Sequence, residues 1–168
     1  DPGSPCGAAP AITPGETMSK VQICNRALSM YLGANSIADI NESSPEAVQC
    51  KLHFDDIRET LLESHWWNWA KGRATLAELT NDRSSEWEFK YQWPGSALAI
   101  HWVNDAETAR TLISQNRSPD ANREVIGDVI YSNVQYAVAE YTRDADDVTE
   151  FPRAFRNAMS AALARLGF

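Results

Sequence analysis

The sequence predicts an α+β fold: a helical bundle of two N-terminal helices and one C-terminal helix, with a small antiparallel β-sheet or barrel inserted. Apolar residues recur at steps of three and four in residues 19–32 and 43–71. Residues 87–93 then alternate aromatic and polar side chains without exception, as a strand with one covered face does. Helical spacing returns in residues 151–166.

The predicted domain covers residues 18–168, with a helical body in 18–72 and 150–168 and a β insertion in 73–143. A chain of 168 residues has room for one domain of ordinary size. Residues 1–17 are rich in Pro, Gly and Ala, and we expect a flexible tail or extension there. They have neither the basic start nor the apolar run of a signal peptide.

The longest predicted helix, residues 43–71, organises the fold. Ser44 can cap its N-terminus and Pro45 can occupy the first helical position, where a missing N–H costs nothing. Arg58 falls on its wet side, and a tryptophan cluster is expected at its end. The predicted buried stripe is Ala47, Cys50, Phe54, Ile57 and Leu61.

A preceding helix, residues 19–32, is expected to pack on this stripe. Ser19 is its candidate cap, and Gly33 is well placed as its C-terminal stop. In the loop that follows, Ile37 and Ile40 should cover the end of the helix pair. The predicted stripe is Val21, Cys24, Leu28 and Tyr31, so Cys24 and Cys50 are interpreted as core residues.

The β insertion is expected to begin with a strand at residues 74–79. The aromatic side chains of residues 87–93 should form the inward face of the sheet, and Ile100 and Trp102 should share a face of the next strand, 98–103. Residues 106–115 fit a short helix or a strand equally. Further strands are predicted at residues 123–126, 129–131 and 135–142, with tight turns at 127–128 and 132–133.

An acidic linker, residues 144–150, precedes the closing helix. Pro152 lies in the first turn of this helix, which is expected to pack back on the first two helices. Its predicted stripe is Phe155, Met159, Ala162 and Leu166.

A net charge of −8 argues against a protein whose affinity comes from neutralising phosphates. Nucleic acid can therefore pass near the chain without being gripped. The apolar content of 43% is that of a folded protein, and no apolar run reaches the roughly 18 residues of a membrane span. We expect no membrane partner.

The common catalytic motifs are absent from the sequence. It contains no G-x-S-x-G, H-E-x-x-H, glycine-rich phosphate loop or C-x-x-C. His53 lies three residues before Asp56 and could act as a base, but a structural role is favoured. The run from Asp144 to Asp147 lacks the glycine and the distal glutamate of a calcium loop. We expect no enzyme activity, catalytic residue, metal or cofactor.

Trp66, Trp67 and Trp69 invite a second interpretation, because flat aromatic faces bind sugars and single strands. A role in sealing the joint between helices and sheet is favoured. The alternatives that stay open are a protein that binds or hydrolyses glycans and an aromatic-sheet binding module.

Several local strings resemble the head-to-tail adaptors of tailed bacteriophages, of the tubular tail protein A kind. They are VQICNRALSMYLGANSI, SPEAVQCKLHFDDIRETLLESHWWNWAKGRATLA, WEFKYQWPGSALAI and VQYAVAEYTRDADDVTEFPRAFRNAMSAALA, which cover most of Met18 to Ala164. The combination of a helix ending in His-Trp-x-Trp-Asn-x-Ala with a Tyr-x-x-Pro-x-x-Ala-Leu strand turn is distinctive. Residues 1–17 have no counterpart in this resemblance.

The resemblance implies a non-enzymatic virion protein that forms a ring, a dodecamer, at the head-to-tail junction. Its implied partners are the portal protein, a downstream tail or nozzle protein and copies of itself, while genomic DNA passes through the ring without specific binding. Assembly would take place in the host cytoplasm. We assign a partner interface to Arg153 and Arg156, three residues apart on one helix face, and to Phe168.

Overall fold

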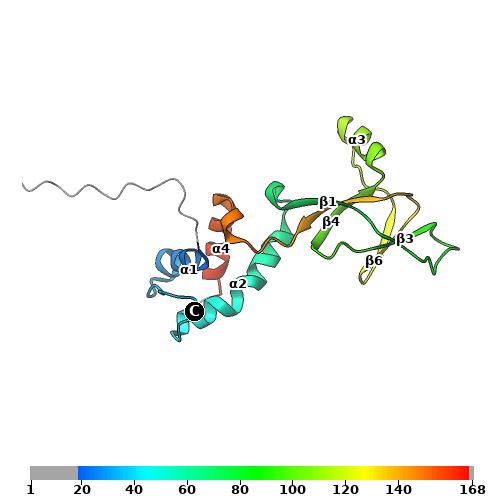
Figure 1. The fold of residues 1–168 in the computed structure, drawn as a ribbon. Helices are drawn as coiled ribbons and strands as arrows, with labels where there is room; N and C mark the ends of the chain where they lie inside the picture. The colour runs from blue at the N-terminus through cyan, green and yellow to red at the C-terminus, as the bar shows by residue number, and fades with distance from the viewer. Residues whose placement is uncertain (1–18, 167–168) are drawn as a thin grey trace, which may run out of the picture. The chain divides into compact units, whose positions relative to one another are not determined.

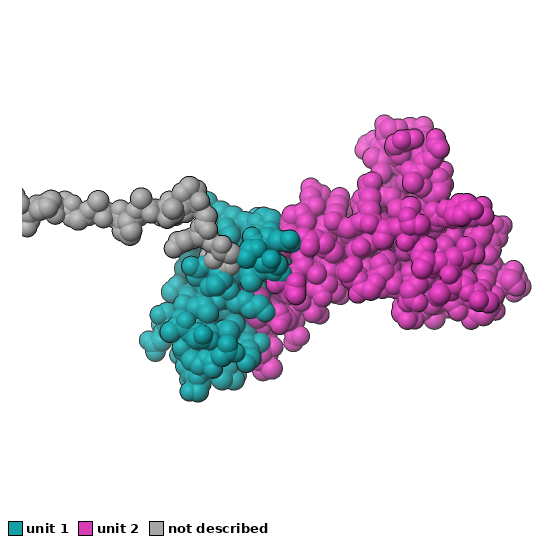
Figure 2. Space-filling model, viewed as in Figure 1, with its two compact units in different colours: residues 1–51, 147–168 teal, residues 52–146 magenta. Residues whose placement is uncertain are grey.

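A computed structural model of the protein, which describes residues 19–166, confirms the α+β class (Figure 1). The described residues form four α-helices and seven strands, and the strands make two antiparallel sheets. The chain divides into two compact units (Figure 2). Unit one comprises residues 1–51 and 147–168, and unit two comprises residues 52–146.

Helix α1 (Lys20–Ala27) begins and ends where the sequence indicates. Ser19 and Gln22 form a reciprocal capping box, and a π-helical turn, η1 (Leu28–Leu32), continues the helix. Gly33 then takes the left-handed conformation, with φ +62°, that stops the helix. The predicted positions Cys24 and Leu28 are buried, Val21 is half-buried, and the side chain of Tyr31 lies outside the described part of the chain. The buried side chains also include Ile23 and Ala27.

The loop after η1 is held by the side chain of Asn25. Its amide donates to the carbonyl of Ile37 at 2.8 Å and accepts the Ile37 N–H at 2.7 Å. These two bonds hold the loop in place within unit one. The Ile37 side chain is buried there, whereas Ile40 is half-buried.

Helix α4 (Arg153–Ala164) packs on α1 within unit one, where the Ser160 hydroxyl donates to the Ile23 carbonyl at 3.1 Å. The helix starts after Pro152, and a 3₁₀ turn, η3 (Val148–Glu150), occupies part of the predicted linker. Ala162 is half-buried and Leu166 is exposed, so these two predicted stripe positions are wrong. The buried residues of α4 are Phe155, Met159, Ser160 and Leu163. Phe155, Met159 and Leu163 are spaced by four and so lie on one face of the helix.

Helix α2 (Pro45–Ser64) starts as predicted but ends seven residues early. Its first turn is capped by the Ser44 hydroxyl, which accepts the Ala47 N–H at 3.3 Å. At the other end, the Trp67 indole N–H donates to the Leu61 carbonyl at 2.8 Å and so satisfies a carbonyl of the last turn. The tryptophan cluster therefore lies beyond the helix, and the next element is a 3₁₀ turn, η2 (Asn68–Ala70).

The buried face of α2 differs from the predicted stripe in its second half. Ile57 and Leu61 are only half-buried, and Arg58, expected in water, is buried. The buried positions follow steps of three and then four: Ala47, Cys50, Phe54, Arg58 and Leu62.

Unit two holds both sheets. The first has the order β1-β7-β4, with β1 at Lys71–Thr75, β7 at Val138–Arg143 and β4 at Ala97–Asn104. The second has the order β2-β3-β6-β5, with β2 at Glu78–Leu79, β3 at Phe89–Gln92, β6 at Val129–Ser132 and β5 at Arg123–Ile126. They share a core of Leu76, Tyr91, Val103, Ile130, Ala137, Ala139 and Tyr141.

The expected inward aromatic face is confirmed at three positions, because Tyr91 belongs to this core and Phe89 and Trp93 pack against it. The predicted strand at residues 74–79 is wrong, since it splits between two sheets as β1 and β2. The turn at Gly127, with φ +60°, joins β5 to β6 as predicted.

The tight turn predicted at residues 132–133 is also wrong. Five residues, 133–137, connect β6 to β7, because these strands belong to different sheets and do not pair with each other. The open segment 106–115 forms a helix, α3 (Ala106–Ser114), with the Asp105 carboxylate accepting the Thr108 N–H at 2.9 Å as its cap.

Candidate functional site

The outer face of the three-stranded sheet carries a row of polar and aromatic side chains next to α3. Along β7, Ala139 and Tyr141 point into the core of unit two, so the alternating residues Val138, Glu140 and Thr142 lie on the opposite face. We call this opposite face, with α3 beside it, the candidate site.

A β-bulge in β4 brings Trp102 to this face. Ile100 pairs with Tyr141 and Trp102 pairs with Glu140, with a register shift between them. Ile100 therefore packs against the core while Trp102 stands beside Glu140, and the prediction that both share a face is wrong. The bulge also places the His101 ring against Thr142, with Nε2 2.9 Å from Oγ1.

Glu140 is the electrostatic centre of the site. It is only 7% exposed, and its carboxylate accepts the Arg73 Nε–H at 2.7 Å. The Lys71 ammonium lies 3.7 Å from its other oxygen. Two cations thus compensate one buried carboxylate, which burial would otherwise penalise.

The same guanidinium covers the tryptophan. The Arg73 Cζ lies 5.3 Å from the centroid of the Trp102 ring, within the range of a cation–π contact. Arg73 and Trp102 both face Glu140 across neighbouring strands, so strand register alone sets this stack. The indole is buried, with the guanidinium over one face of the ring.

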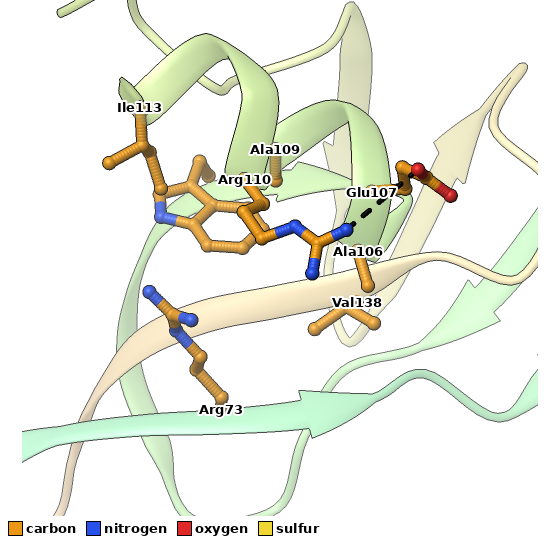
Figure 3. A pocket seen from close by; sticks show the side chains of 8 residues that line it. Arg73, Ala106, Glu107, Ala109, Arg110, Ile113 and Val138 are labelled. Atoms are coloured by element: carbon orange, nitrogen blue, oxygen red, sulfur yellow. Dashed lines mark ion pairs between the residues drawn. The ribbon is translucent and has the colours of Figure 1, made fainter.

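Helix α3 supplies the second wall of a half-open pocket of about 550 Å³. Figure 3 shows Arg73 rising from the sheet and Arg110 hanging from α3 on the other side of the opening. Arg110 lies 3.8 Å from Glu107, one helical turn away, and both side chains are largely in water. The lining comprises Arg73, Trp102, Ala106, Glu107, Ala109, Arg110, Ile113 and Val138.

This lining suits a ligand with an aliphatic or aromatic group beside a carboxylate. The floor is apolar, and the guanidinium groups of Arg73 and Arg110 stand at the rim, where they can donate paired N–H bonds to an acid. Burial lowers the pKa of His101; the Glu140 charge partly opposes this, and the Lys71 charge adds to it.

The tryptophan cluster contributes one further ring to this face. Trp66 is exposed, and its ring centroid lies 4.3 Å from that of His101, with the planes tilted by 48°. Trp67 is engaged with the end of α2, and Trp69 is half-buried. The structure therefore separates the three residues that the sequence groups together.

The residues assigned to a partner interface belong to unit one. Arg153 is exposed and Arg156 is half-buried, both near the start of α4. Phe168 lies outside the described residues. The assignment stays a prediction, as nothing in the structure brings a partner to these side chains.

The acidic residues weighed as ligands have structural roles. The Asp144 carboxylate pairs with Arg58, and the Asp147 carboxylate accepts the Thr149 N–H at 2.9 Å. Within residues 19–166, no group of three or more His, Cys, Asp or Glu side chains is placed to hold a metal ion. His53 is half-buried and Asp56 is exposed on α2.

The two described cysteines meet inside unit one, as expected for core residues. Cys24 and Cys50 are fully buried, and their side chains share a hydrogen bond. That bond and burial raise the pKa of Cys24, and the same bond lowers the pKa of Cys50.

Sequence reasoning missed the site formed by Arg73, Trp102 and Glu140. The alternation along β7 carried a signal, because it puts the Glu140 carboxylate on the face opposite Ala139 and Tyr141. Nothing local marks the bulge that brings Trp102 alongside.

The sequence matches no model of a known protein family, and no curated protein matches it. Among the described residues, no helix combines the length and the apolar character needed to cross a membrane.

Proposed function

We propose that this chain is a structural subunit of a bacteriophage virion, a ring-forming adaptor that joins the portal to the tail and lines the DNA channel. The observation that carries the proposal is the set of strings between Met18 and Ala164 that resemble such adaptors. The α+β order of elements agrees with it.

The residues that carry the resemblance hold the fold of unit two. Trp67 closes the end of α2, and Tyr91 is a core residue whose hydroxyl donates to the Val134 carbonyl at 2.6 Å. Pro94 starts the turn into β4, where its carbonyl accepts the Ala97 N–H at 2.9 Å. Such a pattern supports a shared architecture rather than a shared ligand site.

The charge distribution supports a surface past which DNA moves. The net charge is −8, and several cations of unit two are already paired with carboxylates. A paired guanidinium or ammonium attracts phosphate less strongly than a free one. The surface that this subunit contributes to the channel should therefore have a neutral to negative electrostatic potential. The paired cations include Arg58, Arg73, Arg83, Lys90 and Arg123.

One observation favours a second candidate, a glycan-binding tail component. Trp66 is 58% exposed and offers a flat face, the usual platform for a sugar ring. Oligosaccharides should quench the tryptophan fluorescence of the wild type but not of Trp66→Ala if this candidate is right. Equal quenching of the wild type and the variant would contradict glycan binding at Trp66.

The decisive experiment is imaging by negative stain with a portal protein from the same phage. We expect added density at the portal and rings of identical subunits. The isolated chain should sediment as a monomer or a weakly associated species, because its described exposed apolar residues are scattered among charges. Absence of density at the portal contradicts the adaptor role, and stable rings without portal contradict the expected order of assembly.

A further inference from the structure

Helix α2 presents an acidic and aliphatic face on the side away from its buried stripe. Leu52 is 63% exposed, and Val48, one turn earlier, is half in water. Asp56 and Glu59 follow Leu52 by four and seven residues, so all three lie along one side of the helix. Glu59 shares the Arg58 guanidinium at 3.1 Å, and its side chain is still 46% exposed.

The pocket of the candidate site has the complementary chemistry. Its floor is formed by small and aliphatic side chains of α3 and β7, which suits a branched aliphatic group such as that of a leucine. Its rim carries Arg73 and Arg110, whose forked N–H groups match carboxylates.

We propose that this pocket accepts the α2 face of a second copy of the chain. Leu52 of one copy enters the pocket of the next, and the carboxylates of Asp56 and Glu59 meet Arg110 and Arg73 at its rim. At 1.5 Å per residue these carboxylates start roughly 6 and 10 Å along the helix from Leu52, the spacing of a helix laid in a groove. The inference rests on the proposed function, in which copies associate.

The occupant is a second copy because one chain carries both surfaces. A contact between two different patches is head-to-tail, and repetition of it generates a ring when the rotation closes. The alternative occupant is an acidic helix of a different protein, which would leave Leu52 of this chain without a role.

The first test is disulfide trapping between two chains that each carry one introduced cysteine in a Cys6→Ser background, in which the remaining Cys24 and Cys50 are buried. One chain carries Leu52→Cys and the other Ile113→Cys, at the pocket. Met30→Cys is the matched control, since Met30 and Leu52 are equally exposed at 63%. We expect the Leu52→Cys mixture to form a mixed dimer under mild oxidation at high protein concentration. Equal yields from Leu52→Cys and Met30→Cys overturn the proposal.

The second test reverses charges. Arg110→Glu should lower the mixed cross-link yield several-fold, and Asp56→Arg in the other chain should restore it. Arg117→Glu, also on the surface but outside the pocket lining, should leave the yield unchanged. An added acidic helix from a portal or tail protein should not lower the cross-link yield, whereas added wild-type chain should. If the acidic helix lowers the yield and the wild-type chain does not, the assignment is overturned.

Portal-bound assemblies separate this inference from the function on which it rests. Loss of density with Arg110→Glu but not Arg117→Glu supports both. Normal density with Arg110→Glu removes the pocket contact and leaves the adaptor role standing. Failure of the wild type to join the portal removes the adaptor role, while the cross-link yield still decides whether copies meet at the pocket.

Discussion

Arg58 on α2 donates to the carboxylate of Asp144, 86 residues later, and the same Nη1 donates to the Ala145 carbonyl at 3.0 Å. Its side chain is only 5% exposed. Burial acts to lower the pKa of Arg58, but the bond to Asp144 and the charges of Asp144, Asp55 and Glu59 outweigh burial and raise it. The pair joins the beginning and the end of unit two.

Asp144→Ala should destabilise the protein more than Arg58→Met. The first change leaves a buried guanidinium without its main partner, whereas the second removes the charge and keeps the apolar stem. We expect a loss of about 1–3 kcal/mol for Asp144→Ala, below the value for a fully buried pair because solvent reaches Asp144. Urea unfolding measures both, and a larger loss for Arg58→Met would contradict the argument.

Leu62→Ala should lower the free energy of unfolding by about 2–5 kcal/mol, because Leu62 is fully buried. Phe54→Ala should cost about 3–5 kcal/mol for the same reason. Leu61→Ala, at the position that the sequence placed in the stripe, should cost about 1 kcal/mol or less, since this side chain is half-exposed. Thermal melts compare the three, and equal effects at positions 61 and 62 would mean that the burial of this face is misplaced.

Gly72→Ala should destabilise unit two by about 1–3 kcal/mol. A Cβ at this position would lie 2.8 Å from Cε2 and Cζ of the Tyr141 ring, which belongs to the core. Gly95→Ala is the control, because a Cβ there meets nothing within 4 Å. Chemical denaturation distinguishes them; an unaffected Gly72→Ala would show that the ring moves aside without cost.

His101 should make stability fall as the solution becomes acidic. Burial lowers its pKa below the ordinary value of 6.5, so the unfolded chain binds more protons in that range. The free energy of unfolding should therefore decrease as the pH drops from about 7 to about 5, and His101→Gln should flatten this dependence. The exposed His65 is the control: a slope that disappears in His65→Gln but persists in His101→Gln refutes the assignment.

Double-stranded DNA should bind weakly even at low salt. The net charge is −8 and basic residues are interleaved with acidic ones, so a passing duplex should be weakly repelled or should feel no net attraction. Fluorescence anisotropy should give a dissociation constant no tighter than the ~10⁻⁴–10⁻⁶ M of non-specific binders. Tighter binding with a steep salt dependence would mean that the protein binds the DNA phosphates electrostatically.

The sequence by itself determined the features that depend on near neighbours. The caps at Ser19 and Ser44, the stop at Gly33 and the turn at Gly127 each involve residues within five positions, so local chemistry suffices to predict them. The class of the fold followed from hydrophobic periods of the same short range.

The candidate site and the buried pair of Arg58 with Asp144, in contrast, were decided by tertiary structure. The sequence pattern places Arg58 on the surface, and only the contact with Asp144, distant in the sequence, explains its burial. Trp102 reaches the outer face only because a bulge changes the register of β4 against β7. Pairings between distant segments depend on which strands become neighbours, and no local pattern encodes that choice.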